Sequence, residues 1–221
     1  MNPAAPSDGH RRQNIIYKAL KDRIVFCELL PGSLILETDL IAEFHTSRTP
    51  VREALLRLER EGYIVIEQRK ATRVSRISLS DVHDLMELRL MIEPQIIRNF
   101  GARIDDETRD RLMDNQSRFN ALEQEDSSLQ NLKEFLKLDY EFHYLLISLS
   151  GNKVLIKHLD ELLIQSMRYW YFMLVTMNKR ITEVRTEHRQ VAELLLNNQI
   201  EKAAVALEKH IRKSGELECF E

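Results

Sequence analysis

Residues 38–63, TDLIAEFHTSRTPVREALLRLEREGY, decide the fold of the N-terminal part of this chain. They predict two short helices joined by a tight turn. In the first helix, about Asp39 to Phe44, apolar residues recur at helical spacing, and Thr38 is its expected N-cap. The periodicity breaks from His45 to Ser47, where we expect the turn.

The second helix has a sharper start. We expect it to begin at Pro50, with Thr49 as its cap, because a proline at the first helical position gives up no hydrogen bond. Gly62 is expected to end it. Two short helices, with arginines at the start of the second, are typical of a helix-turn-helix. The alternative is an ordinary helical hairpin whose arginines are solvated. The apolar stripe is Val51, Ala54, Leu55 and Leu58, and the residues off it include Arg48, Arg52, Glu53 and Arg57.

The sequence after Gly62 favours the helix-turn-helix. Tyr63–Ile66 and Arg73–Ile77 are expected to form the strands of a hairpin, and the polar stretch Glu67–Thr72 its basic tip. Between residues 48 and 76 there are eight lysines and arginines against four acidic residues, a balance of +4 in a chain whose net charge is −3. A basic wing directly behind a recognition helix predicts a surface that faces DNA phosphates.

These residues resemble a known family. The stretch SRTPVREAL at Ser47–Leu55, followed by LEREG at Leu58–Gly62, resembles the signature of the GntR family of bacterial transcription regulators. The resemblance covers the whole N-terminal domain and implies a winged helix that binds operator DNA. The chain departs from the family at Ala71, where a glycine usually lets the wing tip approach a groove. The residues expected to contact DNA are Arg48, Thr49, Arg52, Arg57, Arg69, Lys70 and Arg73.

The composition is that of an ordinary soluble protein, with 43% hydrophobic and 30% charged residues among 221. No apolar run approaches the roughly 20 residues of a membrane span, and the N-terminus lacks the apolar core of a signal peptide. We therefore expect a cytoplasmic protein. Cys27 and Cys219 lack the spacing of a disulfide framework or a metal knuckle, and we interpret both as free thiols.

The chain divides by composition into a tail and two domains. Residues 1–10 are an expected mobile tail, residues 11–78 the winged helix-turn-helix domain, and residues 79–221 an all-helical sensor and dimerisation domain. Within the first domain we expect a helix from Gln13 to Leu29 and a short strand from Ser33 to Leu36. Residues 1–78 carry 13 lysines and arginines against 10 acidic residues, whereas residues 79–221 carry 19 against 25, so only the first domain suits nucleic acid.

The second domain is predicted to be an antiparallel helical bundle, which makes the fold class mainly α. Ser80 is the expected cap of its first helix, and Pro94 inside that helix should kink or break it. Six helices are expected: Ser80–Phe100, Asp105–Glu123, Asn131–Ser150, Lys153–Met177, Thr182–Asn197 and Ile200–Glu218.

Four polar residues fall on apolar helix faces. Asp139 and His143 lie one turn apart within the stripe of one helix, and His188 and His210 lie on the buried faces of two others. Each histidine alone is more simply a hydrogen-bonded core residue, but burying all four without partners would cost several kcal/mol. Imidazole and carboxylate ligands suit a divalent transition metal ion, so we expect zinc, with nickel, cobalt and manganese also admissible.

This set also resembles something known. Asp139 with His143, then Glu187 and His188, then His210 are similar to the metal-binding set of the helical, FCD-type ligand-sensing domain in the FadR-like branch of GntR regulators. The resemblance implies a bundle that holds a metal ion in a cavity with a small carboxylate effector beside it. Six helices rather than seven would be typical of the shorter, VanR-like members.

Arg89 is the candidate for binding that effector. It lies on a buried helix face, so its guanidinium can either enter the cavity and hold a carboxylate or form an ion pair with Glu93 one turn away. Other polar and aromatic residues could line the pocket or be plain core: Tyr140, Ser166, Tyr169 and Trp170.

Together these patterns predict a homodimeric transcription regulator, not an enzyme. A winged-helix domain, acting as a repressor, would bind two-fold symmetric operator DNA, and a metal ion in the sensor domain would bind a small organic acid that changes DNA affinity. Two alternatives stay open. One is a metalloenzyme with an appended nucleic-acid domain, and the other is a regulator whose metal is purely structural.

Overall fold

The computed structural model describes residues 8–67, 71–122, 129–177 and 181–215. The chain separates into two compact units, Met1–Ile77 and Ser78–Glu221. Helices dominate both units, and the mainly α fold class is confirmed. No helix in the described ranges is long and apolar enough to cross a membrane. Cys27 is a thiol that takes part in no disulfide among the described residues, and Cys219 lies outside them.

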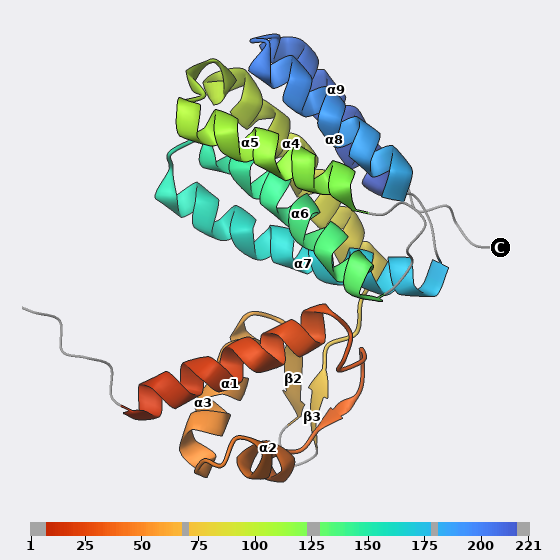
Figure 1. Ribbon diagram of the computed structural model, residues 1–221. Coiled ribbons are helices and arrows are strands. Elements are labelled where there is room, and N and C mark those ends of the chain that lie inside the picture. Colours follow the sequence, from red (N-terminus) through yellow and green to blue (C-terminus); the bar gives the residue numbers. More distant parts are fainter. Residues whose placement is uncertain (1–7, 68–70, 123–128, 178–180, 216–221) are drawn as a thin grey trace, which may run out of the picture. The chain divides into compact units, whose positions relative to one another are not determined.

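The N-terminal unit is a winged helix (Figure 1). Its sheet has the order β1-β3-β2, with antiparallel neighbours and Val65 opposite Arg73. Apolar side chains of the first and third helices form its core, among them Ile16, Leu20 and Leu55, each at most 1% exposed. The elements are α1 (Asp8–Val25), β1 (Leu34–Ile35), α2 (Glu37–Glu43), α3 (Arg48–Arg60), β2 (Ile64–Glu67) and β3 (Ala71–Val74).

The helix-turn-helix forms as predicted, but its helices begin earlier. α3 begins at Arg48 with Ser47 in the N-cap position, two residues before the predicted start at Pro50. The first turn of any helix has N–H groups without helical partners, so proline fits throughout that turn and does not fix the start. α2 likewise begins at Glu37, with Leu36 and not Thr38 in the cap position.

Other boundaries in this unit were also wrong. α1 begins at Asp8, inside the predicted mobile tail, and ends at Val25 because the chain turns at Cys27, which has a φ of 50°. β3 runs from Ala71 to Val74, so residues assigned to the wing tip belong to the strand. Gly62 does follow the end of α3, with a φ of 77° that suits glycine.

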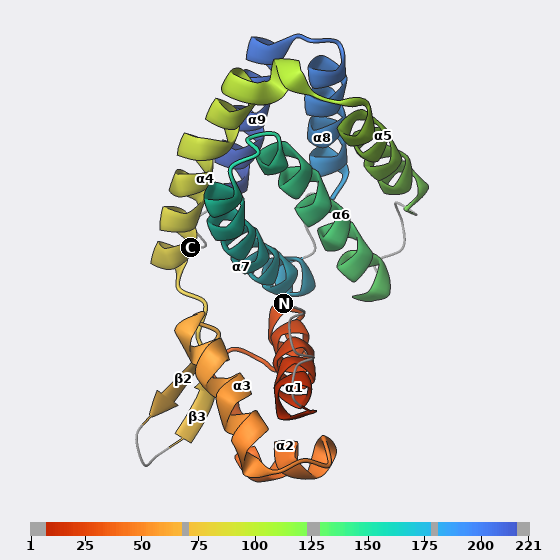
Figure 2. The same ribbon diagram turned by 90° about the vertical axis from the view of Figure 1, so that its left-hand side faces the viewer.

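The C-terminal unit is a bundle of six α-helices within the described ranges, as predicted (Figure 2). Its cap is Ser78 and not Ser80, since the Asp81 N–H donates to Ser78 Oγ at 3.4 Å. Pro94 lies inside a helix that continues unbroken, so the predicted break does not occur. The elements are α4 (Leu79–Phe100), the short η1 (Gly101–Arg103), α5 (Asp106–Ala121), α6 (Leu129–Ser148), α7 (Lys153–Met177), α8 (Ile181–Leu196) and α9 (Ile200–Gly215).

The bundle packs α4 against α9, α8 against α9, and α6 against α7, while α5 covers α6 and α8. One apolar cluster joins α4, α6 and α7 through Ile96, Ile147, Leu159 and Leu163. The described helices also bury polar side chains, and those of Arg89, Glu93, His143, His188 and His210 come from α4, α6, α8 and α9. The candidate site lies between them.

Candidate functional site

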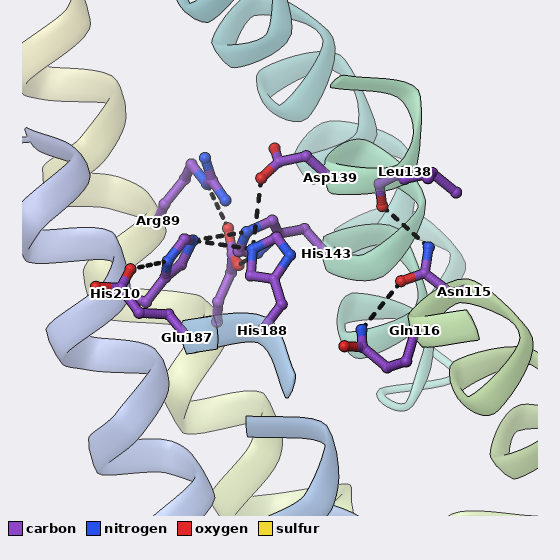
Figure 3. A network of polar contacts seen from close by, with 10 residues as sticks. Arg89, Asn115, Gln116, Leu138, Asp139, His143, Glu187, His188 and His210 are labelled. Atoms are coloured by element: carbon purple, nitrogen blue, oxygen red, sulfur yellow. Dashed lines mark hydrogen bonds and ion pairs between the residues drawn. The ribbon is translucent and has the colours of Figure 1, made fainter. Parts of the chain in front are cut away.

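The structure brings the four predicted metal ligands together (Figure 3). Asp139 and His143 come from α6, His188 from α8 and His210 from α9. One candidate ligand atom from each residue lies within 4.8 Å of the other three. The three imidazoles are buried, and the Asp139 side chain is only 15% exposed.

The ligand atoms face one another at short range. His210 Nε2 lies 3.2 Å from His143 Nε2 and 3.2 Å from His188 Nε2. His188 Nε2 lies 3.4 Å from Asp139 Oδ1. Three imidazole nitrogens and one carboxylate oxygen therefore converge on one point from three helices.

Glu93 of α4 orients His143. The Nδ1–H of His143 donates to Glu93 Oε2 at 2.6 Å, and Arg89 Nε donates to the other oxygen at 2.5 Å. Burial alone would raise the pKa of Glu93, but the Arg89 charge and the hydrogen bonds from His143 and Arg89 outweigh it and hold that pKa well below its ordinary value. Glu93 is therefore an ionised carboxylate. It holds His143 by Nδ1, so that Nε2 faces the other candidate ligands.

Glu187 of α8 orients His210 in the same way. The Nδ1–H of His210 donates to Glu187 Oε2 at 2.8 Å, and Lys213 Nζ donates to Glu187 Oε1 at 2.7 Å. Burial raises the pKa of Glu187, but the hydrogen bonds from His210 and Lys213 outweigh it, so the pKa is lowered. A carboxylate behind a ligating imidazole is the usual outer layer of protein metal sites.

These contacts fix the tautomers of two imidazoles. A carboxylate only accepts hydrogen bonds, so neutral His143 and His210 carry their protons on Nδ1 and present bare lone pairs on Nε2. The two Nε2 atoms lie 3.2 Å apart, where neither can donate to the other. The neutral His188 ring can direct one N–H, on Nε2, toward them. It can therefore donate to only one of the two lone pairs, and the other has no donor. A cation at the common centre would satisfy every ligand atom, so the donor set fits a divalent transition metal ion.

Burial favours the neutral, metal-binding form of two of the imidazoles, those of His143 and His188. Burial lowers the pKa of His143, although the Glu93 charge opposes the shift. Burial lowers the pKa of His188 well below its ordinary value, and the neighbouring His210 and His143 add to the effect. Neutral imidazole nitrogens are available to a metal ion without first losing a proton.

Aromatic rings form the wall behind His188. Its ring stacks on Phe142 with centroids 4.1 Å apart, and it meets the edge of Phe119 at 5.3 Å. His188 Nδ1 has no hydrogen-bond partner in the part of the chain that the structure describes. Ring packing, and not a hydrogen bond at Nδ1, orients this third imidazole, in contrast to the other two.

Three of the four candidate ligands, Asp139, His143 and His210, line a cavity. Its volume is about 20 Å³, room for a single water or ion and not for an organic acid. Polar atoms lie on one side and an apolar wall on the other. The lining residues are Arg89, Phe135, Leu136, Asp139, His143, Trp170, Leu174, Val184, His210 and Ser214.

Arg89 both forms the ion pair with Glu93 and reaches the cavity, the two alternatives that its sequence position left open. Its Nε is paired with Glu93, while its Nη2 is buried without a hydrogen-bond partner among the described residues, and the side chain lines the cavity. Of the other candidate lining residues, only Trp170 reaches the cavity. Tyr140 donates to Asp160, and the buried Ser166 and Tyr169 hydroxyls lie outside the cavity lining.

The candidate DNA-contacting residues of the winged helix are mostly exposed. Arg48 and Arg52 stand at the start of α3, with side chains 64% and 62% exposed, and Thr49 is exposed between them. Arg73 on β3 is exposed and donates through Nη1 to Gly32 O at 3.2 Å. Arg69 and Lys70 lie outside the described residues.

Arg57 differs from the other arginines of α3. Its guanidinium lies over the Tyr17 ring at 3.6 Å from the centroid, and its Nε donates to Glu61 at 3.0 Å. These contacts hold Arg57 against α1, so we leave it out of the proposed DNA contacts. Sequence spacing placed it off the apolar stripe but could not show that Tyr17 lies beneath it.

Sequence reasoning also missed how two glutamates contact the candidate metal ligands. Glu93 appeared only as a partner for Arg89, and Glu187 only beside His188, whereas the structure bonds each to a candidate metal ligand. The signal for Glu93 was a carboxylate on a buried helix face. Neither pairing could be predicted from spacing along the chain, because both partners, His143 and His210, lie on other helices.

Two regions of the chain match known families. Residues 12–74 match the family described as bacterial regulatory proteins, gntR family, and residues 84–213 match the FCD domain. The chain is 32% identical over 183 residues to the Nta operon transcriptional regulator of Aminobacter aminovorans, covering 83% of each protein. It is 30% identical over 152 residues to the HTH-type transcriptional repressor RspR of Escherichia coli strain K12, covering 68% of this chain and 62% of that protein.

The fold is similar to that of solved regulators. A GntR transcriptional regulator from Rhodococcus sp. RHA1 superposes with a TM-score of 0.80 at 18% identity, covering 93% of this chain and 96% of that one. Escherichia coli McbR/YncC superposes with a TM-score of 0.74 at 16% identity, covering 91% and 94%. At these identities the similarity concerns the fold alone.

Proposed function

Because the chain belongs to the gntR family of bacterial regulatory proteins and is a transcriptional regulator with an FCD domain, we propose that a small carboxylate bound beside a divalent metal ion controls its affinity for operator DNA. Asp139, His143, His188 and His210 hold the ion, and zinc is the metal we favour. Arg89 receives the carboxylate. Arg48, Thr49, Arg52 and Arg73 contact DNA, together with Arg69 and Lys70 of the wing tip.

The observation that carries this proposal is the pair of facing lone pairs on His143 and His210. Their Nε2 atoms lie 3.2 Å apart, and when both rings are neutral the carboxylates behind them keep the protons on Nδ1, so neither Nε2 can donate. A structural hydrogen-bond network would pair a donor with each acceptor. This arrangement is costly without a cation and favourable with one.

The carboxylate receptor follows from the charges around the cavity. A bound divalent ion supplies positive charge that attracts a carboxylate oxygen. Arg89 adds a second cation whose buried Nη2 lacks a partner in the described ranges, and an acid oxygen can satisfy it. The apolar wall of Trp170, Leu174 and Val184 then favours an acid with a short hydrocarbon part.

Acid binding must rearrange the sensor unit. The cavity of about 20 Å³ cannot hold an organic acid unless side chains such as Trp170 and Leu174 move apart. Both of these residues lie on α7, so this helix is the element that acid binding would displace. An acid that binds one arrangement of the unit more tightly shifts the population toward it.

We further propose that the protein acts as a homodimeric repressor in the cytoplasm. A relative is named a repressor, and two copies of α3 would read two half-sites related by two-fold symmetry. Acid binding would change the spacing of the two recognition helices and release the operator. Glu93 and Glu187 are both committed to imidazoles, which argues against a free general base and hence against the metalloenzyme alternative.

Metal analysis of gently purified protein tests this proposal directly. We expect one divalent ion per chain, and its loss in the His143→Ala, His188→Ala and His210→Ala variants. His158→Ala removes an exposed histidine of α7 and should retain the metal. Equal metal contents in all four variants would contradict the shared site.

A second measurement separates sensing from a structural ion. Small mono-, di- and tricarboxylates are titrated by calorimetry into metal-loaded and chelator-stripped protein, and into the Arg89→Gln variant. We expect binding to the loaded protein alone and weaker binding to the variant. If no carboxylate binds loaded protein while stripping lowers the melting temperature, the ion is purely structural. Turnover of the acid would favour an enzyme.

A further inference from the structure

Glu37 connects the two arginines at the start of the recognition helix. It is the first residue of α2, and its Oε2 lies 3.5 Å from Arg48 Nε while its Oε1 lies 3.3 Å from Arg52 Nε. The Glu37 side chain is 28% exposed, whereas both arginines are more than half exposed. One carboxylate on the first helix of the motif thus gathers two cations on the second.

Stability gives little reason for this arrangement. Ion pairs between exposed side chains contribute little to folding, because water and salt screen them and long side chains lose freedom. An acidic residue in the first turn of α2 does interact favourably with the helix dipole. Asp39 in the same turn already provides that interaction without reaching either arginine.

The atoms involved point to a role in reading bases. Glu37 contacts both arginines at Nε, through a hydrogen bond from Arg52 and an ion pair with Arg48, and the terminal Nη1 and Nη2 atoms of both make no hydrogen bond to any residue in the described ranges. A pair of arginine N–H groups is the usual partner of guanine O6 and N7 in the major groove. An arginine without such support turns as readily to a phosphate, which carries no sequence information.

We propose that Glu37 is a specificity-determining residue of the helix-turn-helix. It holds Arg48 and Arg52 by Nε so that their terminal nitrogens face base edges. This inference rests on the proposed function, in which α3 reads DNA through these two arginines. An arginine that bound only phosphate would bring the DNA backbone close to Glu37. Repulsion between the Glu37 carboxylate and that phosphate would weaken binding to sequences that offer the arginines no base contact.

The variant Glu37→Gln separates specificity from affinity. Glutamine keeps the size of the side chain but removes its charge, so the arginines become free to move to phosphates. We expect affinity for arbitrary DNA to stay the same or rise and the preference for the operator to fall about tenfold or more. The salt dependence of binding should become steeper, by about one counterion for each arginine that moves to a phosphate.

Asp39→Asn is the matched control. It removes the same charge from the same turn of α2, at an exposed position whose only described side-chain contact is with Thr38. Thermal melts of the full chain should show that both variants fold. Asp39→Asn should discriminate between sequences as the wild type does.

The experiment begins with selection from a random duplex library by the full-length wild type. The enriched duplex and a scrambled duplex of equal length are then titrated with wild type, Glu37→Gln and Asp39→Asn at several salt concentrations, with fluorescence anisotropy as the readout. Loss of discrimination in Glu37→Gln alone supports the proposal. Wild-type discrimination in Glu37→Gln, or an equal loss in Asp39→Asn, overturns it. Failure of the wild type to enrich any sequence would instead overturn the proposed DNA-reading function on which the inference rests.

Discussion

At the scale of single residues, the carboxylates behind the imidazoles determine what the sensor site can bind. Glu93 and Glu187 hold the Nδ1 protons of His143 and His210, so the lone pairs that remain must point at the common centre. His188 receives no such support from the described residues and is held by ring packing. The three imidazoles therefore differ in how firmly each is oriented, although each offers one nitrogen.

Glu93→Gln should weaken metal binding about 10- to 100-fold, because a neutral amide orients His143 less firmly and makes it a weaker ligand. Calorimetric titration of stripped protein with zinc measures the affinity. Glu208→Gln is the control, since Glu208 accepts from Arg98 at 2.7 Å and touches none of the imidazoles. Unchanged zinc affinity in Glu93→Gln would show that Glu93 serves only to neutralise Arg89.

Glu61 gives the winged-helix unit a pH dependence with a definite sign. Burial raises its pKa, but donors such as Tyr17 at 2.6 Å and Lys21 at 3.1 Å outweigh burial, so the pKa lies below the ordinary 4.5. Its stabilising contribution is complete above 4.5 and is lost as the pH falls through the lowered folded-state pKa. Glu61→Gln should therefore cost about 1–2 kcal/mol at neutral pH and progressively less in acid.

Urea unfolding of the full chain across this pH range measures the effect of Glu61. Glu53→Gln, at an exposed position of α3, should leave the free energy of unfolding close to the wild-type value at every pH. A constant difference between Glu61→Gln and wild type from neutral to acid pH would mean that the carboxylate charge does not contribute.

At the scale of the elements, the apolar patterns predicted which helices form but not where they begin. The six helices of the bundle follow from long periodic stretches, and the four inward polar residues were found because each interrupts an apolar face. The start of α3 at Arg48 was missed because a proline is accepted anywhere in the first turn. The roles of Glu93 and Arg57 depend on which helices pack together, and no local pattern encodes that.

The two faces of α3 should respond differently to substitution. Arg52→Ala removes an exposed side chain and should cost about 1–3 kcal/mol of specific DNA binding with little loss of stability. Arg57→Ala removes the contact with Tyr17 and should cost about 1 kcal/mol of stability. Melting curves and anisotropy titrations on both variants check the contrast. A DNA-binding defect in a stably folded Arg57→Ala would return that arginine to the DNA surface.

The turn between α3 and the wing depends on a glycine. Gly62 has a φ of 77°, and a methyl group added to its Cα would meet no described atom within 4 Å, so backbone strain and not crowding opposes an alanine there. Gly62→Ala should therefore destabilise the protein by about 1 kcal/mol. Gly9→Ala is the control, because Gly9 lies in helix α1 with open space around it and alanine favours helix. Equal melting temperatures for the two variants would contradict the strain.

At the scale of the whole molecule, charge separates the two tasks. Residues 1–78 carry 13 basic against 10 acidic residues, and residues 79–221 carry 19 against 25. The excess of basic residues in the N-terminal part suits DNA phosphates. In the acidic C-terminal part, the proposed small acid would depend on local cations, which are Arg89 and the proposed metal ion. Under the proposed function, separate substitutions should alter recognition of the acid and recognition of DNA, and any coupling between the two would be conformational.

That communication has to be reciprocal, which gives the last prediction. An acid that weakens operator binding tenfold must itself bind tenfold more weakly to the operator-bound protein, a coupling of about 1.4 kcal/mol. Calorimetric titration of the acid into free protein and into protein saturated with operator duplex measures both affinities. The His188→Ala variant, which should lack the ion, is expected to show neither acid binding nor coupling while it still binds operator. Acid affinity that is the same with and without operator would mean that the acid occupies the sensor unit without changing the conformation that binds DNA.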